Sequence, residues 1–167
     1  ELKDGILYIS NGTKLYTVDI NTNAVLNTYD IVGFINSSGG GDIAFDSNGV
    51  LYMACFSGLY KFTSFSGGIA NIIRISAENF PYQLTSMAID RQDRIFVGTN
   101  ESNSKLIEMS TEDGSHQIVK EYNFKINDLT AWKCEVEELN PDDTDGDGII
   151  NELDEYPDDG DAAFNVY

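Results

Sequence analysis

The residues best suited to chemistry in this sequence lie close together, between positions 143 and 154. Counted from Asp143, oxygen-bearing side chains stand at positions 1, 3, 5, 9 and 12, and glycine stands at position 6. This is the spacing of a calcium-binding loop. The predicted ligands are the side chains, or for the isoleucine the backbone carbonyl, of Asp143, Asp145, Asp147, Ile149, Asn151 and Asp154.

The order of these residues favours Ca²⁺ over two other interpretations. Ca²⁺ takes six to eight oxygen ligands at roughly 2.3 to 2.6 Å, and alternate residues of a tight loop can supply them. Mg²⁺ uses fewer protein ligands and keeps more of its water. A solvated acidic linker needs no fixed order of Asp, Gly and Ile. Without a cation the carboxylates of this loop repel one another, so we expect Ca²⁺ to order the segment.

The negative charge of the chain is concentrated in the same region. Residues 135–161 hold 13 of the 28 acidic residues and no Lys or Arg, and the formal net charge of the chain is −18. Nucleic-acid binding needs clustered Lys and Arg, and anionic membranes repel such a chain. No apolar run approaches the roughly 20 residues that cross a bilayer. The predicted organisation is a domain at residues 1–134 and an acidic calcium-binding segment at residues 135–167, with no nucleic-acid partner and no membrane insertion.

The elements ahead of this segment repeat with a period of 44 residues. The stretch Asp4–Ile9 recurs as Asn48–Met53 and again as Gln92–Val97. A second apolar stretch follows each copy, at Leu15–Val18, Leu59–Phe62 and Leu106–Met109. A loop lengthened at residues 100–105 accounts for the late start of the last one.

Two further strands complete each predicted unit. Leading strands are expected at Asp42–Phe45 and Ser86–Ile89, and outer strands at 24–31, 69–75 and 117–122. Four short strands in a repeat of this length are typical of a β-propeller blade. Runs such as Ile6–Ile9 are apolar on both faces, as expected for a sheet packed between two others. The predicted fold is therefore all-β: a propeller arc of about three four-stranded blades, followed by a short calcium-binding loop.

The two ends of the repeated region are offset from each other. The chain opens with an expected second strand at Leu2–Ile9, and a first strand is expected at Leu129–Trp132. Propellers use four to eight blades, so three are too few for a closed ring. Two interpretations remain open: two chains join as a homodimer to complete a six-bladed ring, or the chain is a fragment of a longer protein with further domains.

Parts of the sequence resemble known families. The stretch Phe45–Tyr52 followed by Gly58–Phe62 resembles the blade motif of NHL-type six-bladed propellers, which implies an architecture and leaves activity open. Residues 143–161 resemble a thrombospondin type 3 repeat, with Tyr156 where that family carries a cysteine. This resemblance implies a second, partial calcium site at Asp158 and Asp161. The last residues, Asp161–Tyr167, look like the stretch that leads into LruC-type domains of bacterial surface proteins.

The remaining candidates for chemistry are few. His116 is the single histidine, and its surroundings, Gly114–Gln117, predict a turn between strands and not a catalytic site. Asp42, Asp90 and Asp128 stand where a propeller hydrolase or lactonase could hold a channel metal, although such positions more often serve turns and strand starts. No catalytic residue is predicted.

The preferred function is a non-enzymatic binding or adhesion module for a protein or glycan ligand. Aromatic residues at loop positions could contact such a ligand or fill the spaces between blades. They are Phe56, Phe65, Phe80, Tyr82 and Trp132. Calcium modules with dissociation constants of roughly 0.1 to 1 mM fill outside cells, so an extracellular or bacterial cell-surface location of a secreted protein is expected. Whether Cys55 and Cys134 pair is left open, with unpaired burial preferred.

Overall fold

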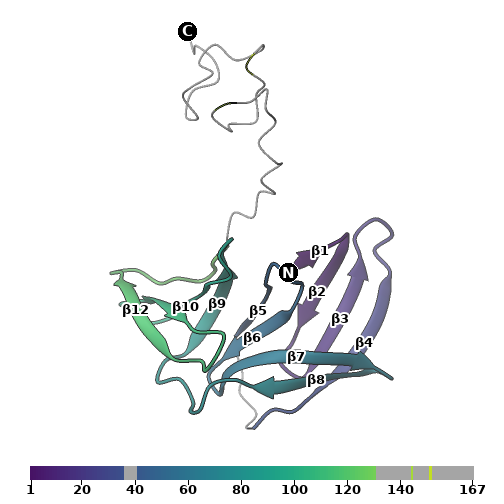
Figure 1. Ribbon diagram of the computed structural model, residues 1–167, viewed down its shortest axis with the longest axis horizontal. Coiled ribbons are helices and arrows are strands. Elements are labelled where there is room, and N and C mark those ends of the chain that lie inside the picture. The colour runs from purple at the N-terminus through teal and green to yellow at the C-terminus, as the bar shows by residue number, and fades with distance from the viewer. Residues whose placement is uncertain (36–40, 131–143, 145–150, 152–167) are drawn as a thin grey trace. The chain divides into compact units, whose positions relative to one another are not determined.

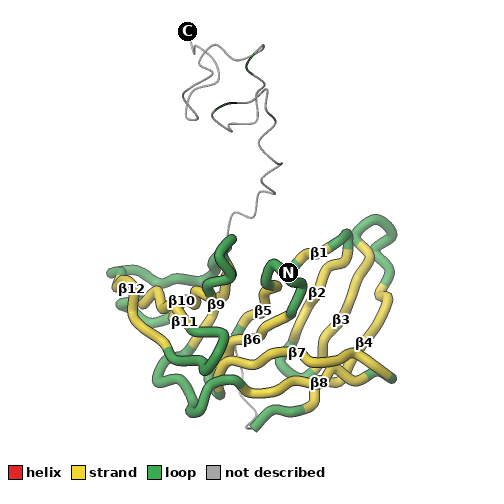
Figure 2. Tube along the Cα trace, in the orientation of Figure 1, coloured by secondary structure: helices red, strands yellow, loops and turns green. Residues whose placement is uncertain are grey.

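The computed structural model describes residues 1–35, 41–130, 144 and 151. All the regular structure in these residues is β-strand, as Figure 2 shows. The strands are β1 (Leu2–Lys3), β2 (Ile6–Ser10), β3 (Lys14–Asp19), β4 (Val25–Val32), β5 (Asp42–Phe45), β6 (Leu51–Cys55), β7 (Gly58–Ser66), β8 (Ile69–Arg74), β9 (Leu84–Ile89), β10 (Ile95–Thr99), β11 (Lys105–Met109) and β12 (His116–Glu121).

These strands form three antiparallel units, which we call blade 1 (β1–β4), blade 2 (β5–β8) and blade 3 (β9–β12). Blade 2 lies between the other two, as Figure 1 shows. In each blade the strands follow one another from the inner edge to the outer edge in chain order. The predicted all-β fold of about three four-stranded blades is confirmed.

The 44-residue period is visible in the backbone of the inner turns. Gly5, Gly49 and Asp93 occupy the same place in successive blades and have φ angles of +75°, +76° and +59°. This left-handed conformation suits Gly and is tolerated by Asp. An aspartate therefore replaces the turn glycine of the third copy without changing the turn.

The expected single strand at Leu2–Ile9 is wrong. Asp4 and Gly5 both have positive φ, and Lys3 pairs with Ile6 across them. Two left-handed residues make a tight two-residue hairpin turn, which suits the twist of the strands on either side. The chain thus opens with a short first strand, β1, and the second strand of the blade begins at Ile6.

Blades 1 and 2 are also joined along their outer edges. β4 and β8 pair in parallel over three residues, with Ile31 opposite Ala70. The pairing makes one eight-stranded sheet of the two blades, whereas blade 3 is a separate four-stranded sheet. The two blades also touch near their inner edges, where the Tyr8 ring packs edge-on against Phe45 with ring centres 4.9 Å apart.

Two apolar cores lie between the blades. One packs blade 1 on blade 2, and the other packs blade 2 on blade 3. The first core contains Leu15, Ile31, Ile43, Phe45, Leu51, Met53, Cys55, Tyr60, Phe62, Ala70 and Ile72. The second contains Ala44, Tyr52, Ala54, Leu59, Phe80, Leu84, Met87, Ile89, Ile95, Val97, Ile107 and Met109. Every residue of β6 is buried, because blade 2 packs on both faces.

The chain leaves blade 3 through residues 122–130. Leu129 and Thr130 lie outside any strand, and the rest of the strand expected at Leu129–Trp132 falls outside the described residues. Internal contacts divide the chain into Glu1–Trp132 and Lys133–Tyr167. Within the described residues, no helix is long and apolar enough to span a membrane.

Candidate functional site

A cleft of about 510 Å³ opens at the inner edge of blade 1. One wall is the end of β2 and the loop after it, including Ile9 and Ser10. The opposite wall comes from blade 2 and includes Asp42, Ile43 and Met53. The cleft therefore combines apolar side chains with a strand edge.

The edge of β2 in this cleft carries main-chain groups that point away from β3. Tyr8 exchanges both of its main-chain hydrogen bonds with Glu1, the N–H of Tyr8 donating at 2.8 Å and the N-terminal ammonium donating to the Tyr8 carbonyl at 3.0 Å. Successive residues of an antiparallel strand turn their main-chain groups to alternate sides. The N–H and C=O of Ser10, two residues beyond Tyr8, are therefore directed to the cleft. They can pair with an extended segment laid along this edge.

The carboxylate of Asp42 binds backbone on both of its oxygens. Oδ1 accepts a hydrogen bond from the N–H of Ile43 at 2.8 Å, and Oδ2 accepts one from the N–H of Met87 at 3.0 Å. Met87 lies in blade 3, so Asp42 ties two blades together. Burial raises the pKa of Asp42, the two backbone hydrogen bonds oppose the rise, and the negative charge of Asp128 adds to it. Asp42 therefore acts as a strap between blades: it links blade 2 to blade 3 through a hydrogen bond.

The other two candidates for channel chemistry hold local turns. Asp90 accepts hydrogen bonds from the N–H groups of Gln92 and Arg94 and pairs with the Arg94 guanidinium. Burial alone would raise the pKa of Asp90, but these bonds outweigh it and hold the pKa below its ordinary value. Asp128 accepts a hydrogen bond from the N–H of Leu129 at 2.9 Å. Among the described residues, no three His, Cys, Asp or Glu side chains lie close enough together to hold a metal ion.

The aromatic candidates divide into core and surface residues. Phe80 is buried, and Tyr82 packs against the same core with the Lys105 ammonium 5.0 Å from its ring centre. Phe65 is 42% exposed but stacks on Phe62, with ring centres 5.7 Å apart. Phe56 is 45% exposed and remains a candidate for ligand contact. Trp132 lies outside the described residues.

His116 and Cys55 occupy structural positions. His116 does not lie in the expected turn, because it begins β12, where its ring packs edge-on against Phe80 at 5.4 Å. Cys55 is a buried free thiol whose sulfur lies 3.4 Å from the Ser57 hydroxyl. Cys134 falls outside the described residues. The His116 ring therefore contacts the loop that holds Phe80, and the Cys55 thiol lies in the core.

One polar contact between blades was not anticipated from the sequence. Asp93, in the inner turn of blade 3, accepts hydrogen bonds from the N–H of Ser47 at 2.7 Å and from its hydroxyl at 2.6 Å. Ser47 lies in the matching turn of blade 2. The signal available in the sequence was the replacement of the turn glycine by Asp93, which places an acceptor where the other copies have none.

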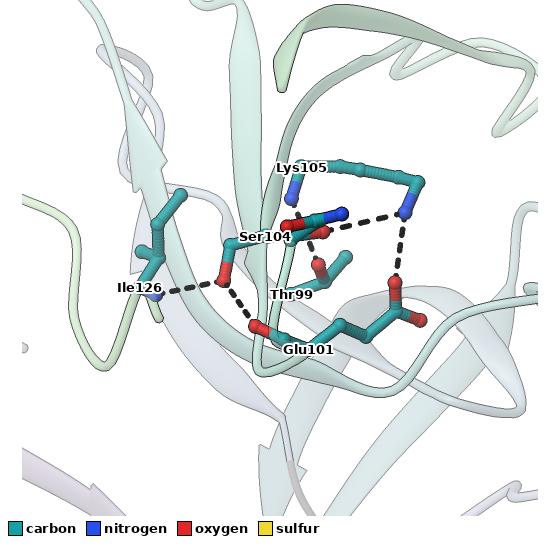
Figure 3. Close-up of polar contacts among 6 residues, drawn as sticks. Thr99, Glu101, Ser104, Lys105 and Ile126 are labelled. Atoms are coloured by element: carbon teal, nitrogen blue, oxygen red, sulfur yellow. Dashed lines mark hydrogen bonds and ion pairs between the residues drawn. The ribbon is translucent and has the colours of Figure 1, made fainter. Parts of the chain in front are cut away.

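The lengthened loop of blade 3 holds the segment that leaves the blade, as Figure 3 shows. The hydroxyl of Ser104 donates to the carbonyl of Glu101 at 3.1 Å and accepts the N–H of Ile126 at 2.9 Å. The Lys105 ammonium pairs with the Glu101 carboxylate at 2.8 Å, and the Lys105 N–H donates to the Thr99 hydroxyl. These contacts fix the path of the chain beyond β12.

Most of the predicted calcium ligands fall outside the described residues. They are Asp143, Asp145, Asp147, Ile149, Asp154, Asp158 and Asp161. The described pair, Thr144 and Asn151, is hydrogen-bonded twice: the Thr144 N–H donates to Asn151 Oδ1 at 2.9 Å, and Asn151 Nδ2 donates to the Thr144 hydroxyl at 2.8 Å. The second and ninth loop positions therefore lie together. The calcium site itself stays a prediction.

Comparison with known proteins supports the architecture. No family model and no curated protein matches the chain, so the resemblances to NHL-type blades and thrombospondin type 3 repeats stay predictions. Among 43 matching chains of solved structures is selenomethionine-substituted virginiamycin B lyase from Staphylococcus aureus, with a TM-score of 0.52 and 15% identity. The chain is a β-propeller arc. The match covers 79% of this chain and 44% of the lyase chain. The chain therefore spans less than half of the length of that protein.

Proposed function

We propose that the chain is a non-catalytic binding or adhesion module of an extracellular or bacterial cell-surface protein, and that its ligand enters the cleft at the inner edge of blade 1. The observation that carries this proposal is the main-chain edge at Ser10, beside the apolar residues Ile43 and Met53 of blade 2. The carboxylate of Asp42 in the same cleft is engaged by two backbone N–H groups, so it orders the blades and is not a free base.

The chemistry of this cleft favours a protein ligand over a glycan. An extended polypeptide can add to an open strand edge through main-chain hydrogen bonds, while pockets beside the edge select its side chains. The edge at Ser10 supplies the main-chain groups, and the neighbouring Ile43 and Met53 supply apolar contacts. The ligand expected here is an extended segment with apolar side chains.

The experiment is a binding screen of the purified chain against arrays of immobilised peptides and of glycans. Ser10→Pro removes the N–H that faces the cleft and blocks pairing along the edge, but it removes no hydrogen bond to β3. Ser10→Ala is the matched control, because it keeps the N–H. We expect peptide binding that Ser10→Pro abolishes and Ser10→Ala retains. Binding of glycans alone, or equal binding by both variants, would refute the proposal.

The acidic segment is proposed to act as a calcium-stiffened linker to a following domain. Asp143, Asp145, Asp147, Ile149, Asn151 and Asp154 would hold the ion, with Asp158 and Asp161 in a second partial site. Bound Ca²⁺ would supply a positive centre that offsets the repulsion among these carboxylates. The hydrogen bonds between Thr144 and Asn151 support a closed loop of this kind.

A second candidate function is part of a propeller enzyme, because the similar fold reported above belongs to a lyase. The direct test is to incubate the chain with virginiamycin B and with a panel of lactones and esters, and to follow loss of substrate by mass spectrometry. Turnover above a heat-treated control would favour this function over the binding module.

A further inference from the structure

Each blade has two faces that play different roles. We call the face that is turned toward the next blade in the chain the trailing face. We call the face that is turned toward the preceding blade the leading face. The trailing face of blade 1 includes Tyr8 and Leu15, which pack on blade 2. In blade 2 the residues 44 positions later, Tyr52 and Leu59, pack on blade 3 in the same way.

The leading faces repeat with the same period. Blade 2 turns four residues toward blade 1: Leu51, Met53, Tyr60 and Phe62. Their counterparts in blade 3 are turned toward blade 2: Ile95, Val97, Ile107 and Met109. All eight side chains are buried. The two seams between blades are thus two copies of one interface, made by a trailing face and a leading face.

The trailing face of blade 3 is open in the part of the chain that the structure describes. Its residues are Ala88, Phe96 and Leu106, the counterparts of Ala44, Tyr52 and Leu59. They line an apolar hollow of about 450 Å³ together with Leu129. Leu59 is 0% exposed, whereas Phe96 and Leu106 are only half-buried.

The leading face of blade 1 is the matching surface. It presents Leu7, Ile9, Tyr16 and Val18, the counterparts of the buried leading-face residues of blades 2 and 3. Ile9 is 44% exposed, and the other three are half-buried. The chain therefore carries one uncovered trailing face and one uncovered leading face of the interface that it forms twice internally.

The charges at the rim of these faces are complementary. Ser47 of blade 2 reaches Asp93 of blade 3, and in blade 1 the counterpart of Ser47, Lys3, lies beside Gly49, where a Cβ would be 3.1 Å from its ammonium. The counterpart in blade 3 is Arg91, which borders the apolar hollow. By the same register, Arg91 would meet Gly5 in the blade 1 of a second copy. The neighbouring Asp4 carboxylate is 84% exposed and pairs with Lys3 of its own chain at 3.4 Å, so it has room for a second cation.

We propose that the chain associates head to tail with a second copy of itself, the trailing face of blade 3 packing on the leading face of blade 1 of the second copy. Continuity with the internal seams and the Arg91–Asp4 complementarity select a second copy as the occupant. Interfaces of this kind close into a ring when the rotation permits, and otherwise extend into a filament. The proposal goes beyond ligand binding in the cleft and does not depend on it.

The test is the mass of the purified full chain by light scattering over a dilution series. We expect a mass of at least twice 18.5 kDa at high concentration. Ile9→Glu and Leu106→Glu, one on each face, should each return the mass to that of a single chain. Ile73→Glu is the matched control, because Ile73 is exposed on outer strand β8 and belongs to neither face.

A charge exchange at the exposed rim tests the same seam without altering a core. Arg91→Glu should weaken association by about two- to fivefold, the range of an exposed ion pair, and adding Asp4→Arg to it should restore the affinity. A wild-type chain that stays at 18.5 kDa at every concentration would overturn the proposal. So would association that Ile9→Glu, Leu106→Glu and Arg91→Glu all leave unchanged.

Discussion

Replacing Asp93 by glycine sets two physical effects against each other. Blades 1 and 2 have glycine at this turn position, and Asp93 shares their left-handed backbone with φ of +59°. Backbone conformation alone predicts that Asp93→Gly relieves strain and stabilises the fold. The structure adds that the Asp93 carboxylate accepts two hydrogen bonds from Ser47 of the neighbouring blade, at 2.7 and 2.6 Å.

The contact should outweigh the conformation. A non-glycine residue in this region costs about 1 kcal/mol, and Asp costs less than most. Glycine also gives the unfolded chain more backbone freedom, which stabilises the unfolded state by roughly 0.5 to 1 kcal/mol. This effect cancels most of the strain that the substitution relieves. Each lost hydrogen bond is worth about 0.5 to 1.5 kcal/mol. Asp93→Gly should therefore lower the free energy of unfolding by about 1 to 2 kcal/mol.

The assay is urea unfolding followed by circular dichroism, for a double-mutant cycle of Asp93→Gly and Ser47→Ala. Ser47→Ala removes the hydroxyl bond and keeps the backbone bond, so the coupling free energy should be about 0.5 to 1.5 kcal/mol. Asp93→Asn keeps one acceptor oxygen, so its free energy of unfolding should lie between those of the wild-type chain and Asp93→Gly. A more stable Asp93→Gly variant, or a coupling of zero, would refute the reasoning.

Three other predictions follow from the seams, the strap and the acidic loop. Leu59→Ala, at a fully buried position, should lower the free energy of unfolding by about 2 to 4 kcal/mol, measured by urea unfolding. Leu106→Ala should lower it clearly less when the chain is dilute and monomeric. Equal losses would contradict the open trailing face of blade 3. The pKa of Asp42 is raised in the folded chain above its ordinary value of about 3.8, so the folded chain binds the Asp42 proton more tightly than the unfolded chain does. Protonated Asp42 therefore contributes stability below pH 3.8, and this stability is lost as the pH rises through the folded pKa. Urea unfolding at several pH values should therefore show wild type losing stability relative to Asp42→Asn as pH rises toward neutral, and parallel pH profiles would count against this. Chelation of Ca²⁺ should speed proteolysis within residues 140–161 and leave residues 1–130 intact, as read by mass spectrometry; the same cleavage sites and rates with and without chelator would exclude the predicted ion.

The blades could be predicted from the sequence because each is specified by local signals. Apolar strands and polar turns recur every 44 residues, and the period survives even where Asp93 replaces glycine. The strand expected at Leu2–Ile9 was wrong for a local reason. Apolar residues flank a two-residue turn at Asp4 and Gly5, so the apolar pattern predicts one strand where the backbone forms two. The lengthened loop before Lys105 was predicted from spacing, but its hydrogen bond to Ile126 was not, because that bond joins residues 22 apart.

The site was harder to predict, because its decisive groups belong to the main chain or to neighbouring blades. The parallel pairing of β4 with β8 joins blades 1 and 2 along their outer edges, and nothing in the variable outer strands encodes that pairing. Asp42 was a candidate for channel chemistry, yet its bond to Met87 of the next blade makes it a strap, which sequence spacing cannot reveal.

The repeat carries information about partners that single residues do not. Leu15, Leu59 and Leu106 are the same residue of the same strand in three successive blades, and the first two are 0% exposed. Leu106 is more exposed because, in the described chain, no leading face covers it. A residue placed by its period on a face buried twice elsewhere in the molecule is therefore expected to be buried a third time. That expectation supports the proposed seam between blade 3 and the blade 1 of a second copy.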